Sequence, residues 1–303
     1  MQRRQFTQSL VATSAGLLFA TASRAVGVQD PMDSKTVSIG CSLGLTGPLA
    51  SLARELKQGL DAGLAQVNAK GINGREIKLV ALDDGYDAKR SEDNARKLIA
   101  DANTVALISC MGTPNNQRIL PLVDEAQIPY VAPQSGATSL RKAEHRSVFH
   151  VRASYTDEVR RLVQRLAGMG LKDIGVVYLD NAYGREMLED STRFLAEQGL
   201  KPLVQVALAT DGKNLSDVLA KVGQARPAAV LLATAGSASV ELVRGLKKNL
   251  PGVLMAGLSV TLTSDGLKQL GDAGSGLAVT MVMPDPNRAK TALVRDYQAA
   301  MRA

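Results

Sequence analysis

The 303-residue sequence contains no tryptophan, and its aromatic residues are limited to six tyrosines and four phenylalanines. A sugar site built on stacked indole rings is therefore excluded, and a nucleic-acid surface built on aromatic stacking is disfavoured. Two cysteines are too few for a disulfide scaffold or a four-thiolate metal site, and two histidines are too few for a histidine-based zinc site. We expect no metal and no cofactor.

Motifs for nucleotide and ester chemistry are also absent. The sequence has no GxxxxGK[ST], no GxGxxG and no GxSxG string. Residues 139–142 match SxxK, but so short a string occurs often by chance, and Asp83-Asp84 is better explained as a capped loop after a strand. We therefore expect a binding protein rather than an enzyme, with an exported α/β enzyme as one alternative.

Residues 1–25 have the pattern of a bacterial secretory signal. Two arginines precede an uncharged apolar run over 10–22, and cleavage after Ala22 or after Ala25 fits the small residues that follow. The string RRQF resembles the twin-arginine export motif, so general secretion and twin-arginine export both remain open. An N-terminal anchor is the alternative, although the run is short for a bilayer. Cleavage after Ala25 removes three arginines and no acid, so the formal charge falls from +7 to +4.

From residue 36 onward, continuous apolar segments alternate with amphipathic ones. We expect strands at 36–42, 76–82, 105–110, 129–132, 148–152, 173–179, 203–208, 228–234, 252–257 and 277–283, with helices between most of them. Strands that are apolar on both faces and joined through helices form parallel sheets. So many strands are better explained by two sheets than by one. The expected fold class is α/β, with two doubly wound parallel-sheet lobes joined by a hinge.

The chain is expected to break between the two lobes near residues 152–156. The first lobe is predicted to comprise residues 35–153 plus 277–303, and the second residues 154–276. Lysines and arginines are scattered along the helices rather than clustered, so we expect no nucleic-acid partner.

Ligands of open parallel sheets bind beyond the carboxyl ends of the strands. Thr46 follows strand 36–42, and Gly112 with Thr113 follows strand 105–110. Each loop leads into a proline that suits a first helical turn, and so directs free backbone N–H groups and a helix dipole toward one crevice. The alternative is that Thr46 and Thr113 are plain helix N-caps. The loops predict a site for a carboxylate or another small anion.

Two further loops extend this candidate site. The loop over 133–138 supplies Ser135 and flexible backbone at the same sheet edge. In the second half, Tyr183 follows strand 173–179 and has the apolar body and polar tip of a lid residue. Packing at a helix start is the alternative for Tyr183.

Cys41 and Cys110 end two strands that should be neighbours, because the first strand of a doubly wound sheet commonly lies beside the third. A disulfide could form after export to an oxidising compartment. Buried free thiols are favoured, because the geometry of a cross-strand bridge is demanding.

Several strings resemble, in order, the periplasmic branched-chain amino-acid binding proteins of ABC importers. They are GLTGPLA, NAKGINGREIKLVALDDGYD, GTPNN, IPYVAPQSGATSLR and YLDNAYGREMLE, and the resemblance extends over residues 36–303. It implies a type I periplasmic binding fold, a clamshell that closes on a small ligand and delivers it to a permease in the inner membrane. It also implies a periplasmic protein without a cofactor, and we expect a monomer.

The resemblance assigns roles to individual residues. Thr113 and Ser135 would contact the ligand through their hydroxyl groups, and Gln134 and Gly136 through backbone groups. Tyr183 falls at the lid tyrosine of the family.

Two departures from the family pattern concern the ligand. The acidic residue that holds an amino acid's ammonium group is replaced by Gly257-Leu258-Ser259, which leaves Ser259 as the candidate contact, and a tyrosine expected near Gly236 is missing. A buried ammonium without a carboxylate partner would be costly. We therefore expect a carboxylate or another small polar organic molecule rather than leucine.

A third departure is length, because family members normally continue past Ala303 and cross between the lobes once more. The sequence predicts either a truncated product, with part of the C-terminal region missing, or a reduced fold.

The ligand-sensing module of a signalling receptor is an alternative function. A sugar-responsive repressor would begin with a DNA-binding helix pair where this chain has a signal.

Overall fold

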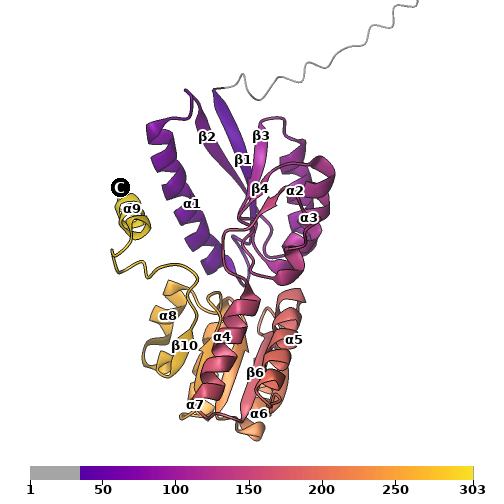
Figure 1. The fold of residues 1–303 in the computed structure, drawn as a ribbon, viewed down its shortest axis with the longest axis vertical. Helices are drawn as coiled ribbons and strands as arrows, with labels where there is room; N and C mark the ends of the chain where they lie inside the picture. Colours follow the sequence, from indigo (N-terminus) through magenta and orange to yellow (C-terminus); the bar gives the residue numbers. More distant parts are fainter. Residues whose placement is uncertain (1–34, 303) are drawn as a thin grey trace, which may run out of the picture.

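The computed structural model describes residues 35–302, which form two α/β halves stacked end to end (Figure 1). The predicted signal segment, 1–25, lies outside the described residues. The first half contains β1 (Thr36–Leu43), α1 (Ala50–Lys70), β2 (Glu76–Asp83), α2 (Ala88–Ala100), β3 (Thr104–Ile108), α3 (Thr113–Ala126), β4 (Tyr130–Val131), the short 3₁₀ helix η2 (Thr138–Leu140) and β5 (Val148–Phe149). Its sheet is parallel, in the order β2-β1-β3-β4-β5.

The second half repeats the arrangement of the first. It contains α4 (Tyr155–Gly168), β6 (Ile174–Leu179), α5 (Ala182–Glu197), β7 (Val204–Leu208), α6 (Leu215–Ala225), β8 (Ala229–Ala233), α7 (Ser237–Asn249), β9 (Leu254–Gly257), α8 (Ser264–Leu270), the 3₁₀ helix η3 (Gly271–Gly274) and β10 (Leu277–Val279). Its strand order is β7-β6-β8-β9-β10. In both sheets, therefore, the second strand of the half lies at one edge and is followed by the first, third, fourth and fifth strands. The two doubly wound parallel sheets confirm the predicted fold class.

Local sequence signals explain where several helices begin. Asp87, the predicted cap of α2, accepts a hydrogen bond from the Arg90 N–H at 2.7 Å. Ser154 caps α4 in the same way by accepting from the Asp157 N–H. The central strands are buried on both faces, and all five residues of β8 are inaccessible to solvent. Helices on both faces of each sheet thus keep the strands from solvent.

The C-terminal segment divides between the two halves. β10 pairs in parallel with β9, matching Leu277 with Met255, and therefore belongs to the second sheet. The prediction that places 277–303 with the first half is wrong for this strand, because an apolar run alone does not say which sheet edge it joins. Beyond β10 the chain crosses to the first half, where α9 (Ala292–Ala300) lies beside α1 (Figure 1). There the Gln66 side chain donates to the Asp296 carbonyl.

Cys41 and Cys110 are both fully buried and unbridged, as the free-thiol interpretation predicts. β1 lies beside β3 as expected, and the Ser42 N–H donates to the Cys110 sulfur at 3.3 Å. Burial raises the pKa of the Cys41 thiol. The Cys41 thiol therefore stays protonated in the core of the first half.

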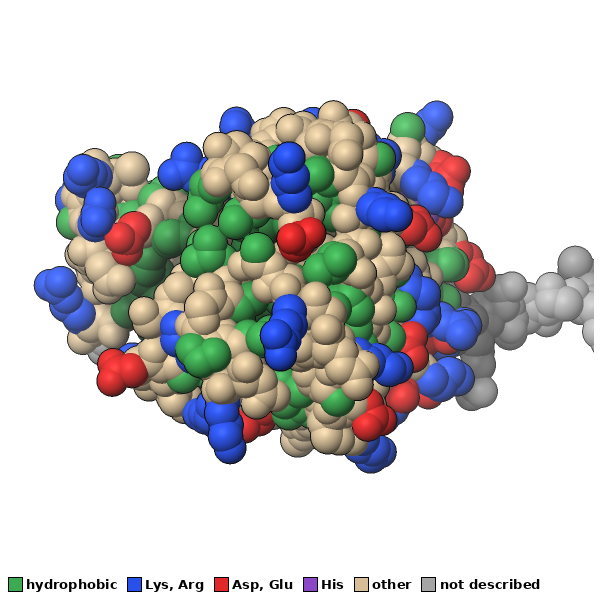
Figure 2. All heavy atoms as spheres, turned by 90° about the horizontal axis from the view of Figure 1, so that it is seen from below, with side chains coloured by type: hydrophobic (Ala, Val, Ile, Leu, Met, Phe, Trp, Pro, Cys, Tyr) green, Lys and Arg blue, Asp and Glu red, His purple; other side chains and the backbone are tan. Residues whose placement is uncertain are grey.

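Basic and acidic side chains are interspersed on the face of the second half shown in Figure 2, without a continuous patch of either sign. This agrees with the scattered lysines and arginines of the sequence. Among the described residues, no helix is long and apolar enough to cross a membrane.

Candidate functional site between the two halves

Loops that follow the strands of both sheets meet in one small cavity. The segments after all five strands of the first sheet contribute, with Tyr155 following β5, and so do those after β6, β8 and β9 of the second sheet. The lining residues are Leu49, Leu52, Tyr86, Met111, Gly112, Thr113, Gln134, Tyr155, Tyr183, Ala235 and Val260. None of them has a charged side chain. The cavity lies at the carboxyl ends of the strands, where doubly wound sheets bind their ligands, and here the loops of two sheets line it together.

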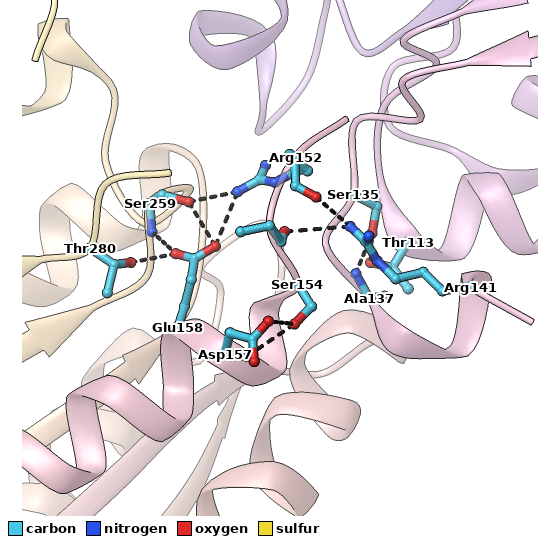
Figure 3. Close-up of polar contacts among 11 residues, drawn as sticks. Thr113, Ser135, Ala137, Arg141, Arg152, Ser154, Asp157, Glu158, Ser259 and Thr280 are labelled. Atoms are coloured by element: carbon cyan, nitrogen blue, oxygen red, sulfur yellow. Dashed lines mark hydrogen bonds and ion pairs between the residues drawn. The ribbon is translucent and has the colours of Figure 1, made fainter. Parts of the chain in front are cut away.

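A pair of hydroxyl groups lies at the beginning of α3. The Thr113 and Ser135 hydroxyl oxygens are 2.8 Å apart, and Ser135 also accepts from the Ala137 N–H at 3.2 Å (Figure 3). Gly112 is the N-cap of α3 and has no side chain with which to cap it. The first N–H groups of a helix have no intrahelical acceptor and favour an anion, so this corner suits a carboxylate.

Tyrosine rings form much of the remaining wall. The rings of Tyr155 and Tyr183 meet edge to face, with 5.0 Å between their centroids. Burial raises the pKa of both phenols, so they stay neutral. The Tyr183 hydroxyl is buried and has no hydrogen-bond partner among the described residues. A buried donor without a partner is costly, so this phenol is poised to bind a polar atom of a ligand.

The two halves are in contact around the cavity. On one side, the Ser237 N–H donates to the Pro48 carbonyl at 3.0 Å, and the Ser51 and Thr263 hydroxyls are 3.3 Å apart. On the other side, the Glu186 carboxylate accepts from the Ser139 hydroxyl at 2.6 Å. The cavity measures only about 20 Å³, which is room for a single water molecule. A larger molecule can therefore enter only if the two halves move apart.

A buried ion pair lies at the junction of the two halves. The Glu158 carboxylate, on α4, accepts from Arg152 at 3.2 Å and from the Ser259 N–H at 2.8 Å, and it also accepts from the Thr280 hydroxyl (Figure 3). Arg152 belongs to the crossing that enters α4, and Thr280 belongs to the return crossing after β10. One carboxylate therefore joins both crossings of the chain.

A second buried carboxylate, Asp84, lies behind the cavity wall. It accepts from the Ser42 hydroxyl at 2.7 Å, from the Asn115 amide at 3.1 Å and from the Tyr86 N–H at 2.8 Å. None of the ion pairs among the described residues includes Asp84, and burial is the main cause that raises its pKa. The Asp83-Asp84 pair is thus a structural loop, as predicted, in which Asp84 orders the segment that carries Tyr86.

Replacing Asp84 with asparagine is expected to lower the free energy of unfolding by about 1–3 kcal/mol, because an amide NH₂ would face hydrogen-bond donors. Burial raises the pKa of Asp84 above its ordinary 3.8, so the folded state resists its ionisation. The stability contribution of Asp84 therefore falls as pH rises from about 4 through the folded-state pKa. Urea unfolding at several pH values should show that the difference in the free energy of unfolding between the native protein and Asp84→Asn becomes smaller as the pH rises. A gap that widens would contradict this arrangement.

The structure brings most of the predicted site residues together. Gly112, Thr113, Gln134 and Tyr183 line the cavity, and Ser135 contacts Thr113 from behind. The Gly136 carbonyl accepts from the Tyr155 N–H at 2.8 Å and so positions that ring.

Thr46 and Ser259 lie outside the cavity lining. Thr46 is exposed, and its hydroxyl donates to Asp83 at 2.7 Å; it does not cap α1, whose N-cap is Leu49. The Ser259 hydroxyl bonds to Arg152 and Glu158 at the junction. A loop's position at a strand end therefore does not determine which of its side chains faces the cleft.

Tyr86 and Tyr155 are site residues that the sequence reasoning missed. Tyr86 follows β2, whose carboxyl end lies at the same sheet edge as those of β1 and β3. Tyrosine is scarce in this chain, and its placement directly after a strand was the available signal. Tyr155 begins α4 at the predicted break between the halves.

Two similar α/β halves with a shared cavity at their strand ends define the class of two-lobed ligand-binding proteins. A family model described as periplasmic binding protein matches residues 36–303, so the chain belongs to that family. The resemblance found in the sequence is thereby confirmed.

Individual relatives are similar along most of the described chain. A substrate-binding periplasmic protein from Ralstonia solanacearum has 28% identity and a TM-score of 0.83, covering 88% of this chain and 76% of that one. A possible leucine/isoleucine/valine-binding protein from Rhodopirellula baltica has 28% identity and a TM-score of 0.79, covering 89% and 74%. A Leu/Ile/Val-binding protein homolog 7 from Brucella suis is 25% identical over 241 residues, 76% of this chain and 58% of the relative. The chain thus spans little more than half the length of that curated relative.

These relatives are substrate-binding proteins and not enzymes, which agrees with the expectation from the missing catalytic motifs. Binding of a small molecule is the function that their names share.

Proposed function

We propose that this protein is an extracytoplasmic solute-binding protein that captures a small carboxylate between its two halves and delivers it to an ABC permease. The observation that carries the proposal is the corner formed by Thr113, Ser135 and the beginning of α3, which offers donors and a helix dipole in a cavity shared by both sheets. Closure would exclude water from the acid, and the contacts made by both halves would favour the closed state.

The cavity offers nothing to balance an ammonium group. Its lining has no carboxylate, and the nearby Glu158 is already paired with Arg152. Glycine, leucine and serine stand at 257–259, where the amino-acid binders have an acid. An amino acid would bury its positive charge without a partner, which is unfavourable.

The names of the relatives and fold neighbours include both amino acids and an acid without an amino group. The Brucella relatives are named for leucine, isoleucine and valine. A fold neighbour from R. palustris, with 20% identity and a TM-score of 0.79, was solved in complex with benzoate. The uncharged cavity of this chain favours the acid without an amino group.

Export and partner follow from the same proposal. The secretory pattern of residues 1–25 and the family membership of 36–303 support a periplasmic location. An inner-membrane permease would receive the ligand from the closed protein. We propose that the protein is a monomer.

Calorimetric titration with leucine, benzoate and short aliphatic acids tests this function. We expect at least one acid without an amino group to bind and leucine to bind more weakly. Thr113→Val removes a hydroxyl donor and should lower the affinity for the acid by about tenfold. Thr46→Val, a matched change outside the cavity, should leave the affinity unchanged. Tight leucine binding with every other acid inert would refute the ligand assignment.

A further inference from the structure

Tyr86 has a backbone conformation that is unusual for an aromatic residue. Its φ is +64°, in the left-handed region that non-glycine residues rarely adopt, and it follows Gly85 at +58°. Such strain persists only where the surroundings fix it, and it clusters at functional sites. Asp84 fixes it here, because its carboxylate accepts from the Tyr86 N–H and its carbonyl accepts from the Asp87 N–H at 2.9 Å.

The strained backbone directs the Tyr86 ring onto the beginning of α3. A Cβ added to Gly112 would lie only 2.6 Å from the ring carbon Cε2, so the ring packs directly against the glycine backbone. Gly112 itself has a φ of +99°. The two unusual conformations together place an aromatic face next to the corner that suits a carboxylate.

Tyr86 also reaches across the cleft. It lines a groove together with Asn181, which caps α5 in the second half by accepting from the Gly184 N–H at 3.1 Å. Asn181 lies two residues before Tyr183, whose hydroxyl has no partner. Tyr86 from the first half and the Tyr155–Tyr183 pair thus enclose the cavity, and they are three of the chain's six tyrosines.

We propose that Tyr86 determines ligand specificity when the two halves have moved apart to admit a ligand, by packing its ring against a flat, aromatic carboxylic acid whose carboxylate binds at the beginning of α3 and whose far edge meets the Tyr183 hydroxyl. Aromatic rings gain from stacked and edge-to-face contacts that a puckered aliphatic ring cannot make. A ring hydroxyl opposite the carboxylate would supply the partner that Tyr183 lacks. This inference rests on the proposed function and deepens it.

Benzoate and cyclohexanecarboxylate form a matched pair of probes, with the same charge and number of carbon atoms but different planarity. In calorimetry with the full chain, we expect benzoate to bind at least tenfold more tightly, and 4-hydroxybenzoate more tightly still. Tyr86→Leu should reduce the preference for benzoate to less than threefold, and Tyr86→Phe should keep it. Tyr297→Leu on α9, where the side chain is exposed, should leave it unchanged.

Thermal melting of each variant establishes that it is folded. Equal binding of the two probes, or a preference for benzoate that persists in folded Tyr86→Leu, would overturn the role of Tyr86 while leaving the proposed function in place. If Tyr86→Leu does not fold, Tyr86→Met replaces it as the variant without an aromatic ring: a preference for benzoate that falls below threefold supports the role of Tyr86, and one that persists overturns it. Failure of every acid to bind would overturn both proposals.

Discussion

Replacing Glu158 with glutamine is expected to lower the free energy of unfolding by about 3–5 kcal/mol, because it removes one partner of a buried ion pair. The Arg152 side chain is only 10% exposed and Glu158 only 4%, so water cannot replace the lost charge. The amide would also confront donors from Ser259 and Thr280 (Figure 3). Because these groups lie on both crossings, the loss should loosen the connection between the two halves.

Urea unfolding followed by circular dichroism measures this effect. Glu197→Gln removes the same charge from an exposed position on α5 and should change stability by about 0.5 kcal/mol or less. If the free energy of unfolding of Glu158→Gln changes by less than about 1 kcal/mol, the Arg152–Glu158 ion pair is exposed to water and does not hold the two halves together.

Gly112→Ala is expected to weaken benzoate binding by at least about a hundredfold, equivalent to roughly 3 kcal/mol. The new methyl group would lie 2.6 Å from the Tyr86 ring, and alanine disfavours a φ of +99°. The ring or the beginning of α3 must therefore move, and both form the proposed site.

Calorimetry with benzoate compares this variant with Gly252→Ala. Gly252 has no atom within 4 Å of an added Cβ and no positive φ, so its substitution should leave the affinity unchanged. Unaltered binding in Gly112→Ala would place the ligand elsewhere.

Much of the fold could be predicted because parallel sheets leave a local signal. Runs such as 228–234 are apolar on both faces, and the pairing of β1 with β3 follows from the common order of doubly wound sheets. The helix α8 was not expected, because its seven residues are too few for a clear apolar period. The sheet that β10 joins was predicted wrongly, since a short edge strand carries no mark of its neighbour.

The site could be predicted only to the level of its loops. Thr113 and Tyr183 face the cavity as expected, since each lies in the first turn of a helix that follows a strand. Thr46 does not, because Asp83, 37 positions away, takes its hydroxyl. The orientation of Tyr86 depends on a buried carboxylate held by Ser42 and Asn115, which no local pattern reveals.

The central claim is that a small acid enters only when the two halves separate. Ser51 and Thr263 lie on opposite sides of the cleft with their hydroxyls 3.3 Å apart, so Ser51→Cys/Thr263→Cys should form a disulfide that holds the halves together. The measurement is benzoate binding by the oxidised and reduced double variant, with Ser51→Cys alone as the control. We predict that oxidation before benzoate is added abolishes binding, and that reduction restores it. Unchanged binding by the fully oxidised variant would contradict a site between the two halves.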